Sequence, residues 1–185
     1  IKLAKKADII QTTTFNGAPP AWLAAKIRKK KVILTVHEVW INRWNQVTNA
    51  RNLSCLIHNF LEKAIYKLNY DYYICVSNAT RSDLLNIKIE ANKATTVYNG
   101  LDYIFWNKDK FPLKQPDNFT IFSWGRPGIS KGFEYLINAM PKIKENIPEA
   151  RLNLMLSAKD KYPARFEELS KLVNEKNKLT NQAIK

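Results

Sequence analysis

Short apolar runs alternate with segments of helical period along this 185-residue chain. The unbroken run at residues 32–36 predicts a strand that is apolar on both faces, which is typical of a sheet covered by helices on both sides. The strands predicted in the first half are residues 7–12, 32–36, 71–76 and 94–98. The helices predicted between them are about 20–28, 53–68 and a helix that Ser77 or Asn78 caps and that runs to about Leu85.

The helix predicted over 53–68 has the clearest pattern in the chain. Its apolar residues recur at spacings of three and four, which is the period of one helix face. They are Leu53, Leu56, Ile57, Phe60, Leu61, Ala64, Ile65 and Leu68. The pattern predicts one apolar stripe over about four turns, and His58 falls outside it, so we expect His58 at the surface.

The second half repeats the alternation after a segment that has no period. Residues 102–118 contain Pro112 and Pro116 among polar side chains, which predicts a linker. The elements predicted after it are strands at 119–124 and 152–156 and helices at about 131–146 and 163–177.

This order of elements predicts two α/β units with parallel sheets, one on each side of the linker. We expect both units to be incomplete, with about three strands in the first and two in the second, whereas an open parallel sheet normally has about five or six. The chain begins with Ile1 rather than Met, and no charged region followed by the apolar stretch of a signal peptide comes after it. We therefore expect a segment of a longer chain.

The charge of the chain is strongly skewed. Thirty Lys and Arg residues against sixteen Asp and Glu give a net charge of +14, and residues 1–116 hold +10 of it. This excess favours an anionic partner, which could be a nucleic acid, an anionic membrane surface or a phosphorylated small molecule. No apolar run approaches the roughly 20 residues of a transmembrane helix.

Several kinds of site are excluded by the residues present. Cys55 and Cys75 have no partner at a metal-binding spacing, so we expect two buried free thiols. His37 and His58 are too few for a multi-histidine metal site. The chain also lacks a P-loop, a dinucleotide-binding glycine fingerprint and an Asp-x-Asp triplet.

The loop with the sequence GRPGISKG has the strongest chemical signal. It follows a predicted strand, contains Gly125, Gly128 and Gly132, and leads into a predicted helix. A helix N-terminus offers free N–H groups and partial positive charge to a phosphate, and glycines let the backbone approach it closely. Arg126 and Lys131 flank the loop, so both could point at one ligand. The alternative is an ordinary turn with two solvated cations.

A second candidate site follows the buried strand 32–36. His37 and Glu38 come directly after this strand, at its carboxyl end, where the crevice of an open α/β sheet lies. A polar pair at this position indicates a binding or catalytic site. A structural histidine is the alternative.

Five sets of motifs between residues 7 and 139 resemble those of a known enzyme family, in the family's order. They are Ala7–Ile10 with Val32–Glu38, Glu62–Tyr66 with Asp71–Ser77, Tyr98–Asp102, Gly125–Gly132 and Phe133–Ala139. On these motifs the chain is similar to family 4 glycosyltransferases. The resemblance implies the GT-B architecture, in which two Rossmann-like domains face each other across a cleft.

The resemblance also implies how the chain is divided. Residues 1–101 would be the latter part of an N-terminal acceptor domain, 102–118 a linker, and 119–185 the first part of a C-terminal domain for the nucleotide-sugar donor. The family's glycine-rich loop would precede Ile1, and nothing after Leu156 resembles the family's pair of donor-binding glutamates. We therefore expect the 185 residues alone to have little or no transferase activity.

Members of this family move a sugar, commonly a hexose, from a nucleotide-diphosphate donor to a saccharide or lipid-linked acceptor, with retention and without a metal or other cofactor. By the resemblance, Arg126 and Lys131 bind the donor diphosphate and stabilise the charge that grows on it. His37 would face the sugar and the acceptor. The other expected site residues are Gly125, Gly128 and Gly132 around the diphosphate, and Glu38 and Asn99 as candidates in the cleft.

The sequence is compatible with other functions. A basic module could dock on an anionic membrane or nucleic acid without catalysis through the cations of residues 26–31. The aromatic residues fall mostly on predicted core faces rather than beside these cations, which disfavours a nucleic-acid surface. A nucleotide-sugar epimerase or a phosphorylase of the same architecture is a third option. The resemblance implies a cytoplasmic enzyme of glycan biosynthesis, with the inner face of the membrane as a second location.

Overall fold

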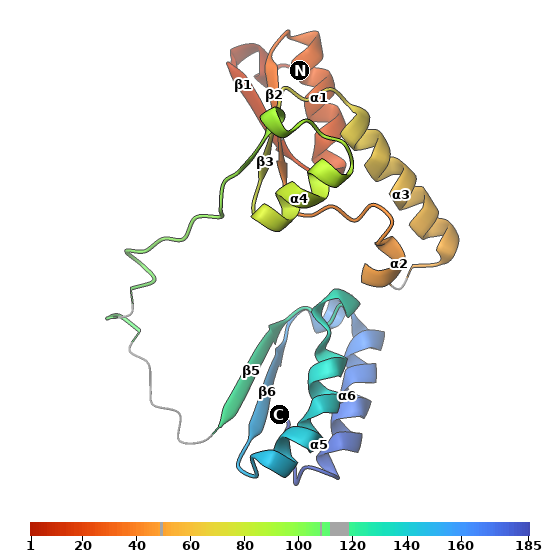
Figure 1. Ribbon diagram of the computed structural model, residues 1–185, viewed down its shortest axis with the longest axis vertical. Helices are drawn as coiled ribbons and strands as arrows, with labels where there is room; N and C mark the ends of the chain where they lie inside the picture. The colour runs from red at the N-terminus through yellow and green to blue at the C-terminus, as the bar shows by residue number, and fades with distance from the viewer. Residues whose placement is uncertain (49, 108, 112–118) are drawn as a thin grey trace. The chain divides into compact units, whose positions relative to one another are not determined.

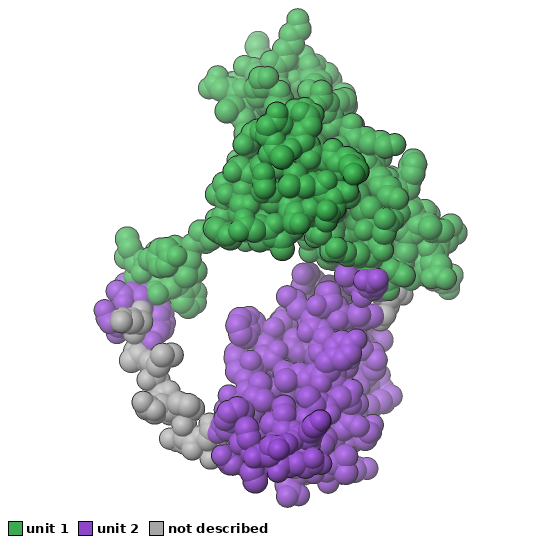
Figure 2. All heavy atoms as spheres, in the orientation of Figure 1, with its two compact units in different colours: residues 1–45, 50–106 green, residues 46–49, 107–185 purple. Residues whose placement is uncertain are grey.

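The computed structural model describes residues 1–48, 50–107, 109–111 and 119–185. The chain divides into two compact units (Figure 1, Figure 2), with residues 1–45 and 50–106 in unit 1 and residues 46–49 and 107–185 in unit 2. Each unit combines a parallel sheet with helices, as the α/β prediction requires.

Unit 1 contains a sheet of four parallel strands in the order β1-β2-β3-β4. Each of the four strands predicted in the first half forms, so only the expected total of about three strands is one too low. The strands are β1 (Ile9–Thr13), β2 (Lys31–Val36), β3 (Tyr72–Cys75) and β4 (Ala94–Thr96). The helices are α1 (Ala18–Ile27), α3 (Asn52–Lys67) and α4 (Asn78–Asn86), with 3₁₀ turns η1 (Leu3–Lys6), η2 (Phe15–Gly17) and η3 (Ala91–Lys93). The short helix α2 (Trp44–Val47) begins in unit 1, and its residues 46 and 47 are assigned to unit 2.

The connecting helices of unit 1 pack against one face of this sheet. Val32, Leu34 and Val36 of β2 are fully buried and share one core with residues of α1, α3 and α4. Ile33 and Thr35, on the other face of β2, are only half-buried. Right-handed crossovers between successive neighbouring strands place their helices on the same side. For the described residues, the prediction of helices on both faces of this sheet is wrong.

Polar side chains fix the ends of several elements in unit 1. The Ser77 hydroxyl accepts a hydrogen bond from the Thr80 N–H at 3.1 Å and so caps α4, as one of the two predicted capping residues. Asp71 accepts from the Val32 N–H at 2.9 Å and pairs with Lys31 at 2.8 Å, which joins the starts of β2 and β3. Lys31 therefore holds the pKa of the Asp71 carboxyl below its usual value.

Helix α3 turns its apolar stripe away from the core. Leu53, Leu56 and Phe60 are 66 to 70% exposed. The buried residues of the helix are Cys55, Glu62, Ile65 and Tyr66, of which only Ile65 belongs to the predicted stripe. The apolar periodicity predicts the helix correctly, but most of the apolar stripe faces solvent instead of packing on the core.

Unit 2 has a sheet of two parallel strands, as predicted. Phe133, Ile137 and Met140 of its first helix form the core with Leu152 and Leu169. Beyond the prediction, Ile184 makes a parallel bridge to Leu152, beside the second strand. The elements are β5 (Thr120–Gly125), η4 (Ile129–Lys131), α5 (Phe133–Asn146), β6 (Arg151–Leu156), η5 (Lys159–Lys161) and α6 (Pro163–Asn177).

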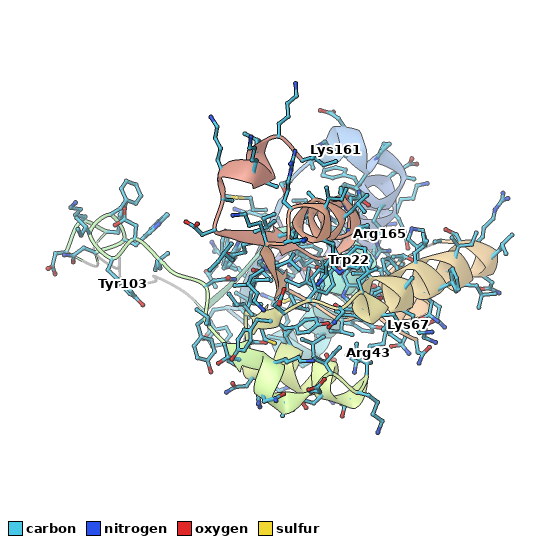
Figure 3. The ribbon with its side chains drawn as sticks, turned by 90° about the horizontal axis from the view of Figure 1, so that it is seen from above. Trp22, Arg43, Lys67, Tyr103, Lys161 and Arg165 are labelled. Carbon is cyan, nitrogen blue, oxygen red and sulfur yellow. The ribbon has the colours of Figure 1, made fainter. Side chains whose placement is uncertain are left out.

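Residues 97–107 and 109–111 contain no helix or strand. No turn forms at Asn99 and Gly100, although the dipeptide predicts one. The first turn comes at Asp102, whose carboxylate accepts the N–H groups of Ile104 and Phe105 at 3.0 Å each. Tyr103 is 78% exposed and stands clear of the sheet (Figure 3). Pro112 and Pro116 lie outside the described residues.

Both cysteines are free and buried, as predicted. Burial raises the pKa of the Cys75 thiol, which makes its reactive thiolate form scarcer. Among the described helices, none has the length and apolar composition to cross a membrane.

Candidate functional site: two strand-end loops

Backbone hydrogen bonds hold the loop after β5 in a defined shape. The Gly128 N–H donates to the Arg126 carbonyl at 2.8 Å, and the Lys131 N–H donates to the Gly128 carbonyl at 3.0 Å. The Ser157 N–H, just after β6, donates to the Gly125 carbonyl at 2.9 Å. The loop is therefore tied to both strands at the carboxyl edge of the unit 2 sheet, which is where open α/β sheets bind ligands.

Two of the three glycines in this loop are required by the backbone itself. Gly125 has φ +147° and Gly132 has φ +63°, values that L side chains rarely adopt. A β-carbon on Gly132 would also lie 3.1 Å from Tyr135 Cδ2. Gly128 has φ −77°, and a β-carbon there would meet only Ser130 Oγ, at 3.8 Å. The fold alone does not require a glycine at residue 128.

Helix α5 begins directly after this loop. The helix starts at Phe133, about two residues later than predicted. Its N-cap is Gly132, which has no side chain to cap the helix with a hydrogen bond. Lys131 lies in the 3₁₀ turn before the helix rather than in its first turn. The first N–H groups of a helix have no intrahelical acceptor, and its dipole adds partial positive charge there. This end of α5 can accept an anion.

Arg126 and Lys131 both expose their side chains on this loop. A β-carbon on Gly125 would lie 3.7 Å from Lys131 Cε, so the stem of Lys131 runs over the end of β5. Neither cation forms an ion pair within the part of the chain that the structure describes. Both charges therefore remain available to an anionic ligand at the start of α5.

An ion pair joins the start of α5 to α6. Arg165 is 12% exposed in its side chain and contacts a carboxylate oxygen of Glu134 at 2.6 Å and one of Glu168 at 2.7 Å. Glu134 lies in the first turn of α5, next to the loop. Arg165 thus balances the one carboxylate of that turn, which would otherwise oppose an incoming anion.

The second candidate site lies at the carboxyl edge of the unit 1 sheet. His37 and Glu38 follow β2 and expose their side chains, while their backbone is held in place. The His37 carbonyl accepts from the Thr80 hydroxyl at 3.2 Å, and the Glu38 carbonyl accepts from the Tyr66 hydroxyl at 3.3 Å. The pair is therefore presented to solvent from a fixed backbone.

A buried carboxylate supports the segment that follows Glu38. Glu62 is 2% exposed and accepts hydrogen bonds from the Trp40 N–H at 2.8 Å and from the Trp44 indole N–H at 2.7 Å. Burial raises the pKa of the Glu62 carboxyl, the two hydrogen bonds oppose this rise, and the negative charge of Glu38 adds to it. Glu62 is thus the anchor of the segment rather than a surface group.

Sequence reasoning does not single out Glu62 or Arg165 as supporting residues. A signal for Glu62 exists, because Cys55, Glu62 and Tyr66 recur at spacings of seven and four and form a second face of the 53–68 helix. The apolar stripe on the opposite face is the stronger pattern and hides it. No comparable signal marks Arg165, whose partner Glu134 is 31 residues away.

The predicted site residues fall into separate groups. Arg126 and Lys131 share one loop of unit 2 with the three glycines, and His37 and Glu38 are neighbours in unit 1. Asn99 is exposed in the segment after β4, where the preceding Tyr98 hydroxyl accepts from Asn78 Nδ2 at 3.1 Å. A β-carbon on Gly100 would meet nothing within 4 Å. No group of three or more His, Cys, Asp or Glu that could hold a metal occurs among the described residues.

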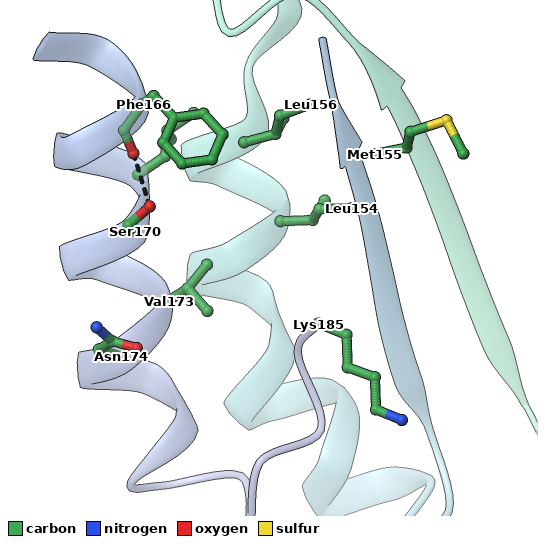
Figure 4. A pocket seen from close by; sticks show the side chains of 9 residues that line it. Leu154, Met155, Leu156, Phe166, Ser170, Val173, Asn174 and Lys185 are labelled. Carbon is green, nitrogen blue, oxygen red and sulfur yellow. Dashed lines mark hydrogen bonds between the residues drawn. The ribbon is translucent and has the colours of Figure 1, made fainter. Parts of the chain in front are cut away.

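A pocket of 440 Å³ lies between β6 and α6 of unit 2 (Figure 4). Its lining is largely apolar, and the Ser170 hydroxyl donates to the Phe166 carbonyl of its own helix at 2.8 Å. None of the predicted site residues lines it. We assign it no part in the site. The apolar lining residues include Leu154, Leu156, Phe166, Leu169 and Val173.

The family comparison matches the first part of the chain. The model described as Glycosyltransferase Family 4 matches residues 1–103, which is more than half of the chain. None of the curated proteins compared with the chain matches it.

Solved structures match the chain over its whole length. HepE of Anabaena, in complex with UDP and glucose, has a TM-score of 0.66 at 16% identity, over 100% of this chain and 48% of its own. The UDP-forming α,α-trehalose-phosphate synthase of Burkholderia xenovorans has a TM-score of 0.70 at 16% identity, over 100% of this chain and 48% of its own. The chain thus spans about half the length of these structures. Their similarity confirms the predicted fold of two Rossmann-like units of the GT-B type.

Proposed function

Since the chain belongs to glycosyltransferase family 4, we propose that it serves the transfer of a sugar from a nucleotide-diphosphate sugar to a saccharide or lipid-linked saccharide. The observation that carries this proposal is the loop after β5. It presents Arg126, Lys131 and the start of α5 together at one sheet edge. The similar HepE structure holds UDP and glucose, and the similar trehalose-phosphate synthase is UDP-forming, which supports a UDP-sugar as the donor.

The loop would act on the leaving group. The bond between the sugar C1 and the diphosphate oxygen breaks, the acceptor hydroxyl oxygen forms the new bond to C1, and its proton passes to the released diphosphate. Negative charge grows on the diphosphate as the old bond breaks. Arg126, Lys131 and the N–H groups at the start of α5 are placed before the reaction, so they stabilise this charge without reorganisation. We propose that they do so without a metal and that the anomeric configuration is retained.

We assign Gly128 a role in donor binding, because the fold alone does not require a glycine at this residue. A β-carbon at residue 128 would fit the chain without strain, unlike one at Gly125 or Gly132. We propose that the glycine leaves room for the diphosphate to approach the backbone of the loop. Gly125 and Gly132 give the loop its shape instead.

His37 and Glu38 would serve the sugar and the acceptor. Their exposed side chains stand on a backbone that Thr80 and Tyr66 hold in place, which suits hydrogen bonding to sugar hydroxyls. Asn99, exposed after β4, is proposed as a further contact on the acceptor side. We propose residues 1–101 as acceptor-domain sequence, 102–118 as the linker and 119–185 as donor-domain sequence.

We propose further that the 185 residues alone have little or no transferase activity. They span 48% of the solved HepE and of the trehalose-phosphate synthase. They also contain nothing after Leu156 that resembles the family's donor-binding glutamates. Turnover of any sugar nucleotide by the bare chain would contradict this part of the proposal.

The experiment that tests the function measures sugar transfer by the complete protein. UDP-, GDP- and ADP-sugars are offered with saccharide and lipid-linked acceptors, with and without EDTA, and the anomer of the product is read by proton NMR. We expect transfer from one class of nucleotide sugar, also in the presence of EDTA, and with the anomeric configuration of the sugar retained. Epimerised free donor, or phosphorolysis in place of transfer, would instead identify one of the other enzymes of this architecture.

Matched variants assign the effect to the loop. Arg126→Ala and Lys131→Ala should each lower kcat by about a hundredfold or more, as the loss of a preorganised charge stabiliser does in other enzymes. Lys142→Ala, an exposed cation on α5 away from the loop, should leave kcat unchanged. Near-normal rates in both loop variants would show that the assigned roles are wrong.

A further inference from the structure

The first turn of α5 combines groups that attract an anion with a carboxylate that repels it. The backbone N–H groups of Phe133 and Glu134 donate to no acceptor within the part of the chain that the structure describes. Such N–H groups and the helix dipole attract negative charge. The side chain of Glu134 lies in the same turn. A carboxylate is itself a ligand for free N–H groups at a helix start, so Glu134 can compete with a phosphate for them.

Arg165 of α6 binds the Glu134 carboxylate from the side. Helices α5 and α6 lie side by side (Figure 1), and both contribute to the core of unit 2. Arg165 Nη2 contacts Glu134 Oε2 at 2.6 Å, while Arg165 Nη1 contacts Glu168 Oε1 at 2.7 Å. One guanidinium thus binds two carboxylates through two different nitrogens, as its planar shape allows. The Glu134 carboxylate is therefore held towards α6.

The ion pair of Arg165 contributes little to stability by itself. Arg165 Nε is buried and has no hydrogen-bond partner among the described residues. The cost of removing the guanidinium from water offsets much of its attraction to the two carboxylates. Replacing both members of such a pair by neutral groups is often harmless, whereas removing one member leaves a charge without compensation. Arg165 and Glu134 can therefore be tested as a pair.

A second ion pair of α6 offers a comparison. Lys171 Nζ contacts Glu167 Oε1 at 2.8 Å, and both side chains are more than half exposed. Loss of Lys171 changes the net charge by the same amount as loss of Arg165, and it also frees a carboxylate on the same helix. That carboxylate belongs to α6, however, and not to the first turn of α5.

We propose that Arg165 is a positioning residue for the donor diphosphate, because it keeps the Glu134 carboxylate away from the N–H groups at the start of α5. Without Arg165, Glu134 competes with the diphosphate for these N–H groups and for Lys131, which lies three residues earlier in the chain. The inference rests on the proposed function, since that function assigns the diphosphate to the loop after β5. Arg165 acts through Glu134 and needs no contact with the donor.

The test is isothermal titration calorimetry of the purified protein with inorganic pyrophosphate, which presents two linked phosphates without the sugar or the base. Arg165→Gln should weaken pyrophosphate binding about tenfold, because the freed carboxylate of Glu134 opposes the anion. Arg165→Gln combined with Glu134→Gln should bind within about twofold of the wild type, since neither charge of the pair is left. Glu134→Gln alone should bind at least as tightly as the wild type.

The matched control is Lys171→Gln. This variant separates the position of the freed carboxylate from the change in net charge, because Glu167 lies outside the first turn of α5. It should bind pyrophosphate within about twofold of the wild type, as expected for an exposed ion pair. Circular dichroism and thermal denaturation of each variant show whether the fold is kept.

Failure of this inference differs from failure of the proposed function. If the wild type binds pyrophosphate and Arg165→Gln binds it equally well, only the inference is overturned. Weak binding that the added Glu134→Gln does not restore shows a structural role for Arg165, and an equal loss in Lys171→Gln shows an effect of net charge. Both results overturn the inference as well. If the wild type binds no pyrophosphate, the loop is not a diphosphate site and the inference falls with it.

Discussion

Helices α3 and α5 have similar apolar periodicity and opposite packing. In α5, Phe133, Ile137 and Met140 are buried and form the centre of the unit 2 core. In α3, Leu53, Leu56 and Phe60 follow the same kind of spacing but face solvent. The difference lies on the other side of each helix. On that side of α3, the carboxylate of Glu62 accepts hydrogen bonds from Trp40 and Trp44. The buried residues of α5 include no ionisable group.

An apolar stripe identifies an amphipathic helix but does not tell which of its faces is buried. Periodicity indicates that a segment forms an amphipathic helix, because the spacing matches the helix turn. Which side packs depends on the partners that each side finds in the rest of the fold. A buried ionisable group with good hydrogen bonds outweighs several exposed leucines, because leaving it unpaired costs more than leaving them in water.

The strongest test of this contrast removes one large apolar side chain from each helix. Ile137→Ala in α5 should lower the free energy of unfolding of unit 2 by about 3 kcal/mol, because it leaves a cavity in a closed core. Phe60→Ala in α3 should change the stability of unit 1 by less than about 0.5 kcal/mol, because the ring is 70% exposed. Urea denaturation of both variants checks this. Equal losses would refute the opposite packing of the two helices.

The next test addresses the anchor of α3. Glu62→Ala should destabilise unit 1 by about 2 kcal/mol, since it leaves the Trp40 N–H and the Trp44 indole N–H without their acceptor. Glu62→Gln keeps a carbonyl oxygen and should lose less. Hydrogen exchange of the amide of Trp40 follows the same contact. An Ala variant as stable as the wild type would show that Glu62 does not orient the helix.

A smaller effect is expected where α5 begins. Gly132→Ala should cost about 1 kcal/mol, because residue 132 has φ +63° and its β-carbon would press on the Tyr135 ring. Gly100→Ala is the matched control, as its β-carbon would meet nothing and its φ is not in the left-handed region. Thermal denaturation compares the two. If both substitutions cost the same, the start of α5 does not depend on the conformation of Gly132.

The smallest effect is a dependence of unit 1 stability on pH. Burial raises the pKa of Glu62 above 4.5 in the folded chain, so the folded state holds this proton more tightly than the unfolded state. The stability of the wild type relative to Glu62→Gln should therefore fall as the pH rises from 4.5 through the raised pKa, and be constant below it. Urea titrations of both proteins at several pH values measure this. A relative stability that rises over this range would contradict the assigned shift.

Much of the fold could be predicted from the sequence, because its signals are local. The apolar runs of β2 and β3 and the periodicity of α3 and α5 each lie within a few turns of chain, and the structure contains all four elements. The one-sided cover of the unit 1 sheet could not be predicted. The pattern of residues 32–36 indicates that the strand is apolar on both faces, but it does not indicate which helices pack against either face of the sheet.

The candidate site is predictable in its residue types and less so in its support. Arg126 and Lys131 stand out because cations and glycines gather between a strand and a helix. Helix α5 starts at Phe133, directly after Gly132, which has a left-handed backbone conformation. The loop contains several glycines that could adopt this conformation, so the sequence alone does not tell at which of them the helix begins. Arg165 and Glu62 act through partners distant in sequence. The spacing that places Glu62 on a second helix face does not tell which groups it binds, and Arg165 has no comparable signal.

The most direct test of the central claim, that the loop after β5 binds a diphosphate, is the titration of UDP into the 185-residue chain, followed by the ³¹P resonances of both phosphates. We expect shifts that saturate with the wild type and with Lys142→Ala. We expect Arg126→Ala combined with Lys131→Ala to weaken binding by about a hundredfold, because two charge-assisted contacts to the diphosphate are lost. Equal UDP affinity in the wild type and in the double variant would contradict it.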